Sequence, residues 1–187
     1  IAREKGKGNK AYQLERMFVV QSEARNKFIT KLITGMQGNT LVIVRLIEAH
    51  GEPLHAMISK KTNRPLYFVN GKVDSDDREQ IRKIINTHTD SITVASAGCF
   101  SEGINVPNID NIVLISGGRS TINTMQILGR GLRKSERKSK CNVYDIADDL
   151  RVVDNSARYN LLLKHAIART KMYDAEGFPY KEFRIPL

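Results

Sequence analysis

Short apolar runs of strand length recur along this chain, and segments with helical spacing separate them. The first run, NTLVIVR, spans residues 39–45 and is followed by RPLYFVNG, DSITVAS, NIDNIVLIS and KCNVYDIAD. Short runs rich in β-branched residues favour strands over helices. Strands that are apolar throughout are buried on both faces, as in a parallel sheet covered by helices. The alternation therefore predicts a three-layer α/β fold with a mostly parallel sheet.

The intervening segments predict helices. Apolar residues recur at helical spacing from about Ser22 to Met36, with Ser22 as a candidate cap. Three more helices are predicted in GEPLHAMISKK, DSDDREQIRKIINTH and STINTMQILGRGLRK. A long last helix is expected to end at Gly177 and Pro179 and to pack back on the sheet. Its regularly spaced residues are Leu161, Leu162, His165, Ala166, Arg169 and Met172.

These elements predict one α/β domain with a C-terminal helical extension. We expect residues 1–21 to be an entry segment, residues 22–153 the domain, and residues 154–187 a helix and tail packed on it. The sequence opens on Ile rather than Met. We therefore expect it to be a piece of a longer protein.

Charge and hydropathy narrow the class of protein. Lys and Arg number 30 against 20 Asp and Glu, and a net charge of +10 attracts polyanions such as nucleic acid or an acidic membrane, between which the net charge alone does not choose. No run approaches the roughly 18 apolar residues that span a bilayer, and the start IAREKGKGNK lacks the apolar part of a signal peptide. We expect a protein of the cytoplasm that binds no membrane.

Cysteine and histidine give little support for a metal site. Cys99 and Cys141 lie in or beside apolar segments and predict two reduced core thiols. The four histidines form no pair with metal-ligand spacing. We predict no bound transition metal.

A glycine-rich loop follows the third predicted strand. In parallel α/β sheets, ligands bind at the carboxyl ends of the strands, where SAGCFSEGINVP begins. Glycine amides can approach a phosphate closely, and the serines and Asn105 supply polar groups. A connecting loop, with glycines for turning and Pro107 for rigidity, is the alternative.

The helix after the fourth strand carries QILGRGLRK. On a helix, Gln126, Arg130 and Arg133 project from one face, and arginine forks suit bidentate phosphate contact. Gly129 and Gly131 cost about 1 kcal/mol each relative to Ala, so a purely structural helix has little reason for them. A solvated basic face would explain Lys134 and its basic neighbours, but not Gln126 or the glycines.

These segments resemble the second RecA-like motor domain of superfamily-two helicases. ASAGCFSEGINVP resembles motif V of that family, QILGRGLRK its motif VI, and TLVIVRLIEAHGEPLHAMI its motif IV. YFVNGKVDSDDREQI matches the strand, Gly71 and Arg78 that come between. The resemblance covers Asn39 to Asp149. IADDL and YNLLLKHAIARTKMYDAEGFPY resemble the C-terminal end of phage recombination-repair helicases.

The resemblance implies that ATP and Mg²⁺ are held mainly by a first RecA-like domain, to which residues 1–21 would lead. Arg130 and Arg133 would reach the γ-phosphate, and Gln126 would contact the phosphate or a bound water. Nucleotide contacts are implied for Glu102, Gly103 and Asn105. Nucleic-acid contacts are implied for Arg45, Gly71, Lys72, Ser96 and Ser101. The segment from Ser96 to Gly103 is one residue longer than the commoner motif V, so both serines are kept as candidates.

The implied function is the C-terminal motor half of an ATP-dependent DNA helicase or translocase acting on forks, Holliday junctions and R-loops. This chain alone is expected to be inactive, because it has no Gly-x-x-x-x-Gly-Lys-Ser/Thr and no acidic Walker box. Two alternatives stay open: the motor of a restriction endonuclease, and a nucleic-acid-binding module without ATPase activity. A dinucleotide-dependent oxidoreductase is disfavoured, because no Gly-x-Gly-x-x-Gly follows the first strand.

Overall fold

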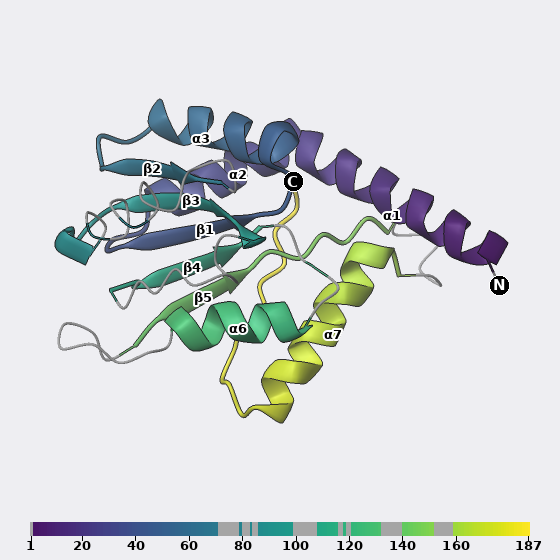
Figure 1. Cartoon of the computed structure of the whole chain (residues 1–187). Helices are drawn as coiled ribbons and strands as arrows, with labels where there is room; N and C mark the ends of the chain where they lie inside the picture. The colour runs from purple at the N-terminus through teal and green to yellow at the C-terminus, as the bar shows by residue number, and fades with distance from the viewer. Residues whose placement is uncertain are drawn as a thin grey trace.

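The sheet has five strands, all parallel, as the sequence predicts (Figure 1). The strands are β1 (Thr40–Val44), β2 (Leu66–Val69), β3 (Ile92–Ser96), β4 (Asn111–Leu114) and β5 (Asn142–Asp145), in the order β2-β3-β1-β4-β5. The computed structural model describes residues 2–70, 79, 83, 86–98, 108–115, 118, 121–131, 140–151 and 159–187, and only the backbone of residues 2–9, 121, 130 and 131. The three central strands are almost wholly buried, whereas edge strands β2 and β5 are partly exposed.

Helices cover both faces of the sheet. α2 (Glu23–Thr34) and α3 (Glu52–Ser59) lie on one face, and α6 (Thr121–Gly131) lies on the other (Figure 1). Alternate residues of β1 point to opposite faces. Val42 and Val44 therefore join the core beneath α2 and α3, while Leu41 and Ile43 join the core beneath α6. This confirms the predicted three-layer arrangement.

Two helix ends lie where the sequence predicts them. Ser22 caps α2, because its hydroxyl oxygen accepts a hydrogen bond from the backbone N–H of Arg25 at 3.4 Å. α7 (Leu161–Ala175) ends just before Gly177, whose φ of 69° lies in the left-handed region that favours glycine. The helix predicted in DSDDREQIRKIINTH lies mostly outside the described residues, although Glu79, Lys83, Asn86 and Thr87 are helical.

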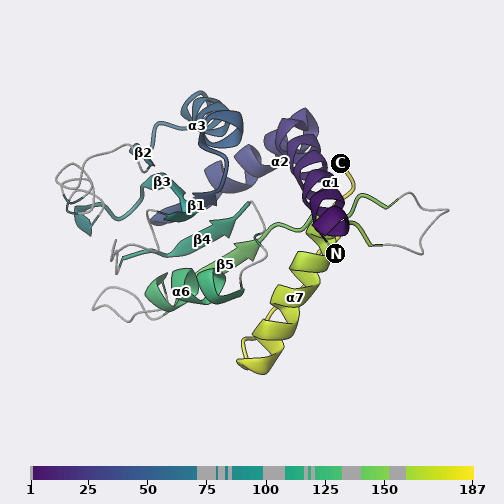
Figure 2. The ribbon, with the colours of Figure 1, turned by 45° about the vertical axis from the view of Figure 1, so that its right-hand side comes forward.

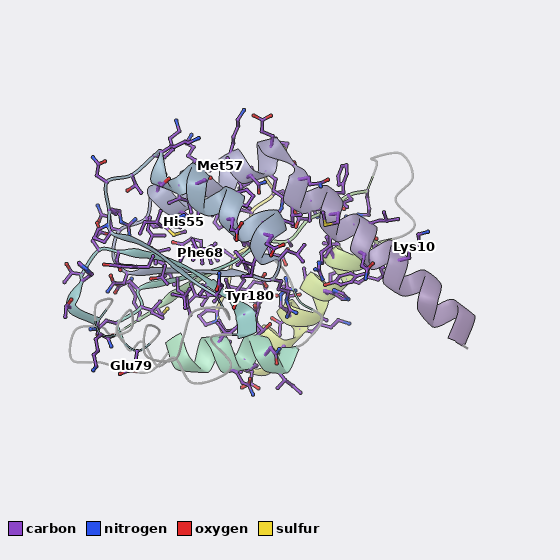
Figure 3. All side chains as sticks on the ribbon, turned by 45° about the horizontal axis from the view of Figure 1, so that its top comes forward. Lys10, His55, Met57, Phe68, Glu79 and Tyr180 are labelled. Carbon is purple, nitrogen blue, oxygen red and sulfur yellow. The ribbon has the colours of Figure 1, made fainter. Side chains whose placement is uncertain are left out.

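A π-helical turn, η1 (Ile47–Gly51), leads from β1 into α3 and was not predicted. A Cβ on Gly51 would lie 3.2 Å from both Phe68 and Val44, so glycine lets this turn approach the sheet closely. One turn further along, His55 of α3 packs on Phe68 of β2 with ring centroids 5.4 Å apart; both are labelled in Figure 3. Burial lowers the pKa of His55, which favours its neutral, packed form.

The entry segment is largely a helix, α1 (Ala2–Gln21), which the sequence analysis did not anticipate. α1 packs against α7 at the carboxyl edge of the sheet (Figure 2). Val19 and Val20 form an apolar cluster with Leu162, and the Leu162 N–H donates to Glu15 Oε2 at 3.0 Å. Two elements from distant parts of the sequence thus form a third small core.

Three expectations on composition can be followed in the described residues. Cys141 is half-buried and packs beside the core under α6, while Cys99 lies outside the described residues. Among the residues that the structure describes, no helix is long and apolar enough to cross a membrane. In the same part of the chain, no three His, Cys, Asp or Glu side chains gather as a metal site would require.

Candidate nucleotide and nucleic-acid interface

The carboxyl edge of the sheet brings two of the predicted nucleic-acid contacts together. Arg45 directly follows β1 and Ser96 is the last residue of β3. Val44 and Ser96 are register partners in adjacent parallel strands, so Arg45 and Ser96 end neighbouring strands at the same edge. Both are half-buried. Arg45 and Ser96 thus lie at the same edge of the sheet, and their nucleic-acid contacts stay predictions.

Arg45 lies against Gly118, in the connection between β4 and α6. A Cβ built on Gly118 would overlap the Arg45 guanidinium, so a side chain at position 118 would displace it. Gly118 is itself buried. The sequence analysis did not single it out, although a glycine pair directly after an apolar strand was a visible signal.

Arg169 of α7 holds the same glycine from another side. Its Nε and one terminal nitrogen donate to the two carboxylate oxygens of Asp145 at 2.7 and 2.8 Å, and its other terminal nitrogen donates to the Gly118 carbonyl at 3.2 Å. The Tyr173 hydroxyl donates to Asp145 Oδ2 at 2.9 Å. We call Arg169 and Asp145 the Arg169 pair. Arg169 is only 1% exposed, so these groups form a buried hydrogen-bond network.

The electrostatics of the Arg169 pair favour its charged form. Burial alone would lower the pKa of Arg169, but the hydrogen bonds and charge of Asp145 raise it overall. Burial, and then the charge of Asp145, raises the pKa of Tyr173. Its hydroxyl therefore stays protonated and remains a donor to Asp145.

A second buried pair lies nearby. Arg25 of α2 donates to both carboxylate oxygens of Asp148, at 2.5 and 2.9 Å, and to the carbonyl of Ile115 at 2.7 Å. We call Arg25 and Asp148 the Arg25 pair. Beside it, Nε2 of the fully buried His50 lies 3.1 Å from Asn26 Oδ1. Burial, and then the charge of Arg25, lowers the pKa of His50 to about 4.

The outer face of α6 is open where the sequence predicts phosphate contact. Ile127 and Leu128 are buried against the sheet, whereas Gln126 and Gly129 are exposed. Among the residues that the structure describes, and apart from the backbone of α6 itself, a Cβ on Gly129 would meet no atom within 4 Å. The backbone of Arg130 continues this helix. Of the motif residues whose side chains the structure describes, Gln126 and Gly129 thus face away from the core of this domain, whereas Ile127 and Leu128 face it.

Several predicted site residues lie outside the described residues, so their roles stay predictions. They are Gly71, Lys72, Ser101, Glu102, Gly103, Asn105 and Arg133. The described set comprises Arg45, Ser96, Gln126 and the backbone of Arg130. The structure brings Arg45 and Ser96 to one edge and Gln126 to the outer face of the helix that begins near that edge (Figure 1).

The all-parallel sheet with helices on both faces is the fold of the second RecA-like domain of superfamily-two helicases. Residues 24–135 match the family of the helicase conserved C-terminal domain, and the chain belongs to that family. It is similar to the ATP-dependent DNA helicase uvsW of Enterobacteria phage T4, with 34% identity over 91% of this chain and 36% of that protein. The crystal structure of T4 UvsW superposes with a TM-score of 0.74 at 31% identity, covering 91% of this chain and 37% of that chain.

A more distant likeness concerns the fold alone. Domain 2 of the DEAD-box helicase Mss116p, solved with an RNA duplex, has a TM-score of 0.54 at 19% identity and covers 67% of this chain and 49% of that chain. The present chain spans little more than a third of the length of the phage helicase. The recognised family and its RecA-like fold confirm the resemblance drawn from the motifs.

Proposed function

We propose that this chain is the C-terminal motor half of an ATP-dependent DNA helicase or translocase that remodels branched DNA in recombination, repair and replication. Its similarity to a phage DNA helicase over 91% of its length supports this. The observation that carries the proposal is the exposure of Gln126 and Gly129 on α6, with no other described side chain over Gly129, on the face where a nucleotide held by another domain would bind. Its place of action would be the cytoplasm, that of the host if a phage encodes it.

In this proposal, Arg130 and Arg133 approach the γ-phosphate of ATP, and Gln126 contacts the phosphate or a bound water. An arginine in that position neutralises charge that develops in the transition state. Glu102, Gly103 and Asn105 contact the nucleotide from the loop after β3. Mg²⁺ and the remaining phosphate contacts are assigned to an N-terminal RecA-like domain of the same protein.

DNA binds through its backbone at the carboxyl edge of the sheet. Arg45 and Ser96 stand at the ends of the neighbouring strands β1 and β3 and would supply a charge and a hydroxyl. Gly71, Lys72 and Ser101 are proposed to extend this surface. Contacts of this kind make binding strongly dependent on salt and largely indifferent to base sequence. Closure of the two domains on ATP, and their release after hydrolysis, would then step the strand along.

The test compares ATP turnover of this chain with that of the complete motor, meaning this chain joined to its upstream RecA-like domain. Turnover only in the complete motor, stimulated by branched DNA, is expected. Arg130→Ala and Arg133→Ala should each lower turnover by about 10³-fold or more with DNA binding nearly unchanged. Lys171→Ala, an exposed lysine on α7, is the control and should keep full turnover.

Two results would count against the proposal. Unchanged turnover in both arginine variants would remove their assignment at the γ-phosphate. No turnover in the complete motor, together with salt-dependent DNA binding, would favour a binding module without ATPase activity.

A further inference from the structure

We propose that Arg169 is a positioning residue for ATP turnover: through Gly118 it holds the start of α6, and with it the face that carries Gln126 and Arg130. This inference rests on the proposed function. Arg169 itself lies on α7, beyond residues 24–135, where the family match ends. It therefore supplies something that the matched part of the domain does not contain.

The position of Gly118 limits where α6 can begin. It stands three residues before Thr121, the first residue of α6. Three residues span at most about 11 Å, so the place of Gly118 limits where α6 can begin. Arg169 fixes that place by donating a hydrogen bond to the Gly118 carbonyl while its other nitrogens grip Asp145 at the end of β5.

Arg45 confines Gly118 on its other side. The Arg45 guanidinium occupies the space where a side chain at position 118 would begin. Gly118 therefore lies between two arginines, one from the nucleic-acid edge and one from α7. A shift of either arginine would move Gly118 and with it the start of α6. The arrangement therefore connects the proposed DNA contact of Arg45 to the proposed ATP contacts of α6.

The burial of an arginine at position 169 calls for a reason other than stability. Replacing a buried ion pair by apolar residues is often neutral or stabilising, so stability alone does not call for Arg169 at 1% exposure. An apolar side chain could fill the space but could not hold a carboxylate and a backbone carbonyl in fixed relative positions. The planar arginine fork does both, and Lys has no equivalent geometry.

The Arg25 pair provides a matched control. Both pairs are buried, both use two carboxylate contacts, and both donate to a backbone carbonyl. Arg25 reaches Ile115, however, whose backbone N–H is already bonded to Ile43 of β1 at 3.4 Å. The sheet holds Ile115 in place without Arg25, whereas Gly118 lies beyond the strand.

The experiment places Arg169→Lys and Arg25→Lys in the complete motor, each alone and combined with Gln126→Ala. Arg169→Lys should lower kcat at least tenfold with little change in the KM for ATP, and its effect should be non-additive with Gln126→Ala. Arg25→Lys should change kcat less than twofold and combine additively with Gln126→Ala. Equal losses of kcat in the two lysine variants, or additivity for Arg169→Lys, would overturn the inference.

Amide hydrogen exchange over residues 121–131 gives a readout independent of turnover. Faster exchange in α6 is expected for Arg169→Lys and not for Arg25→Lys. Equal protection of α6 in the two variants would overturn the inference even in a protein without ATPase activity. An inactive wild-type motor, or a Gln126→Ala variant with normal turnover, would instead overturn the proposed function, so the two failures are distinguishable.

Discussion

The Arg25 pair and the Arg169 pair use the same chemistry in different parts of the fold. Each joins a buried arginine to an aspartate that is 15% exposed, and the two aspartates lie three residues apart at the end of β5. Arg25 comes from α2, within the residues matched to the helicase family, and reaches the end of β4. Arg169 comes from α7 and reaches the connection that leads into α6.

This difference separates two roles of a buried ion pair. The Arg25 pair joins a helix to a sheet that its own hydrogen bonds already order. The Arg169 pair attaches α7 to Gly118, which stands between β4 and α6 and belongs to neither element. The two pairs thus constrain different parts of the fold, and we expect only the Arg169 pair to affect α6.

Removing either aspartate should produce the largest loss of stability. Asp145→Ala and Asp148→Ala each leave a buried arginine without its carboxylate, which costs about 3–5 kcal/mol. Asp145→Ala should be the more damaging, because the Tyr173 hydroxyl also loses its acceptor. Urea denaturation followed by circular dichroism measures both values.

Asp149→Ala is the neighbouring control for this prediction. Asp149 pairs with Arg151 on the surface, and its loss should leave the urea midpoint unchanged within error. An Asp148→Ala midpoint as close to wild type as that of Asp149→Ala would show that the Arg25 pair is not stabilising.

Acid should weaken the region around the Arg25 pair. The pKa of His50 is about 4 in the folded protein and 6.5 ordinarily. Between these two pH values the unfolded chain therefore binds a proton at His50 more readily than the folded protein does. This contribution is complete above pH 6.5, falls as the pH falls, and is lost below about pH 4; it amounts to roughly 3 kcal/mol. Urea denaturation at several pH values, compared with His50→Gln, measures it. A His50→Gln variant with the wild-type pH dependence would contradict the assignment.

The smallest expected effect tests a group that only the Arg169 pair possesses. Tyr173→Phe removes one buried hydrogen bond to a carboxylate and should cost about 1–2 kcal/mol. Tyr180→Phe, on the exposed segment after α7, should leave the thermal midpoint unchanged. Equal midpoints for the two variants would mean that the Tyr173 hydroxyl adds nothing to the Arg169 pair.

Much of the fold could be predicted because its signals are local. The apolar runs gave the strands, and Ser22 and Gly177 marked helix ends. α1 was missed because its sequence contains Gly6 and Gly8 and lacks a clear apolar stripe. α1 packs against α7 and α2, and such packing, rather than local helix propensity, stabilises most helices in proteins.

The exposed position of Gln126 on its helix could be predicted from the sequence. The contacts of Arg169 that hold the start of this helix could not. The spacing of Gln126 and Arg130 placed them on one helix, and Gln126 is exposed as expected. The partners of Arg169 are 24 and 51 residues away, and only the folded chain brings them together. A charged residue at a regularly spaced position of an apolar helix was the available signal.

The contact between α1 and α7 sets an order of events during synthesis. Glu15 and Leu162, joined by a hydrogen bond, are 147 residues apart in the sequence. At roughly 5–20 residues per second, a ribosome needs about 7 to 30 seconds to pass from one to the other. Throughout that interval Val19 and Val20 lack their partner on α7, which leaves a time window in which a chaperone could bind α1.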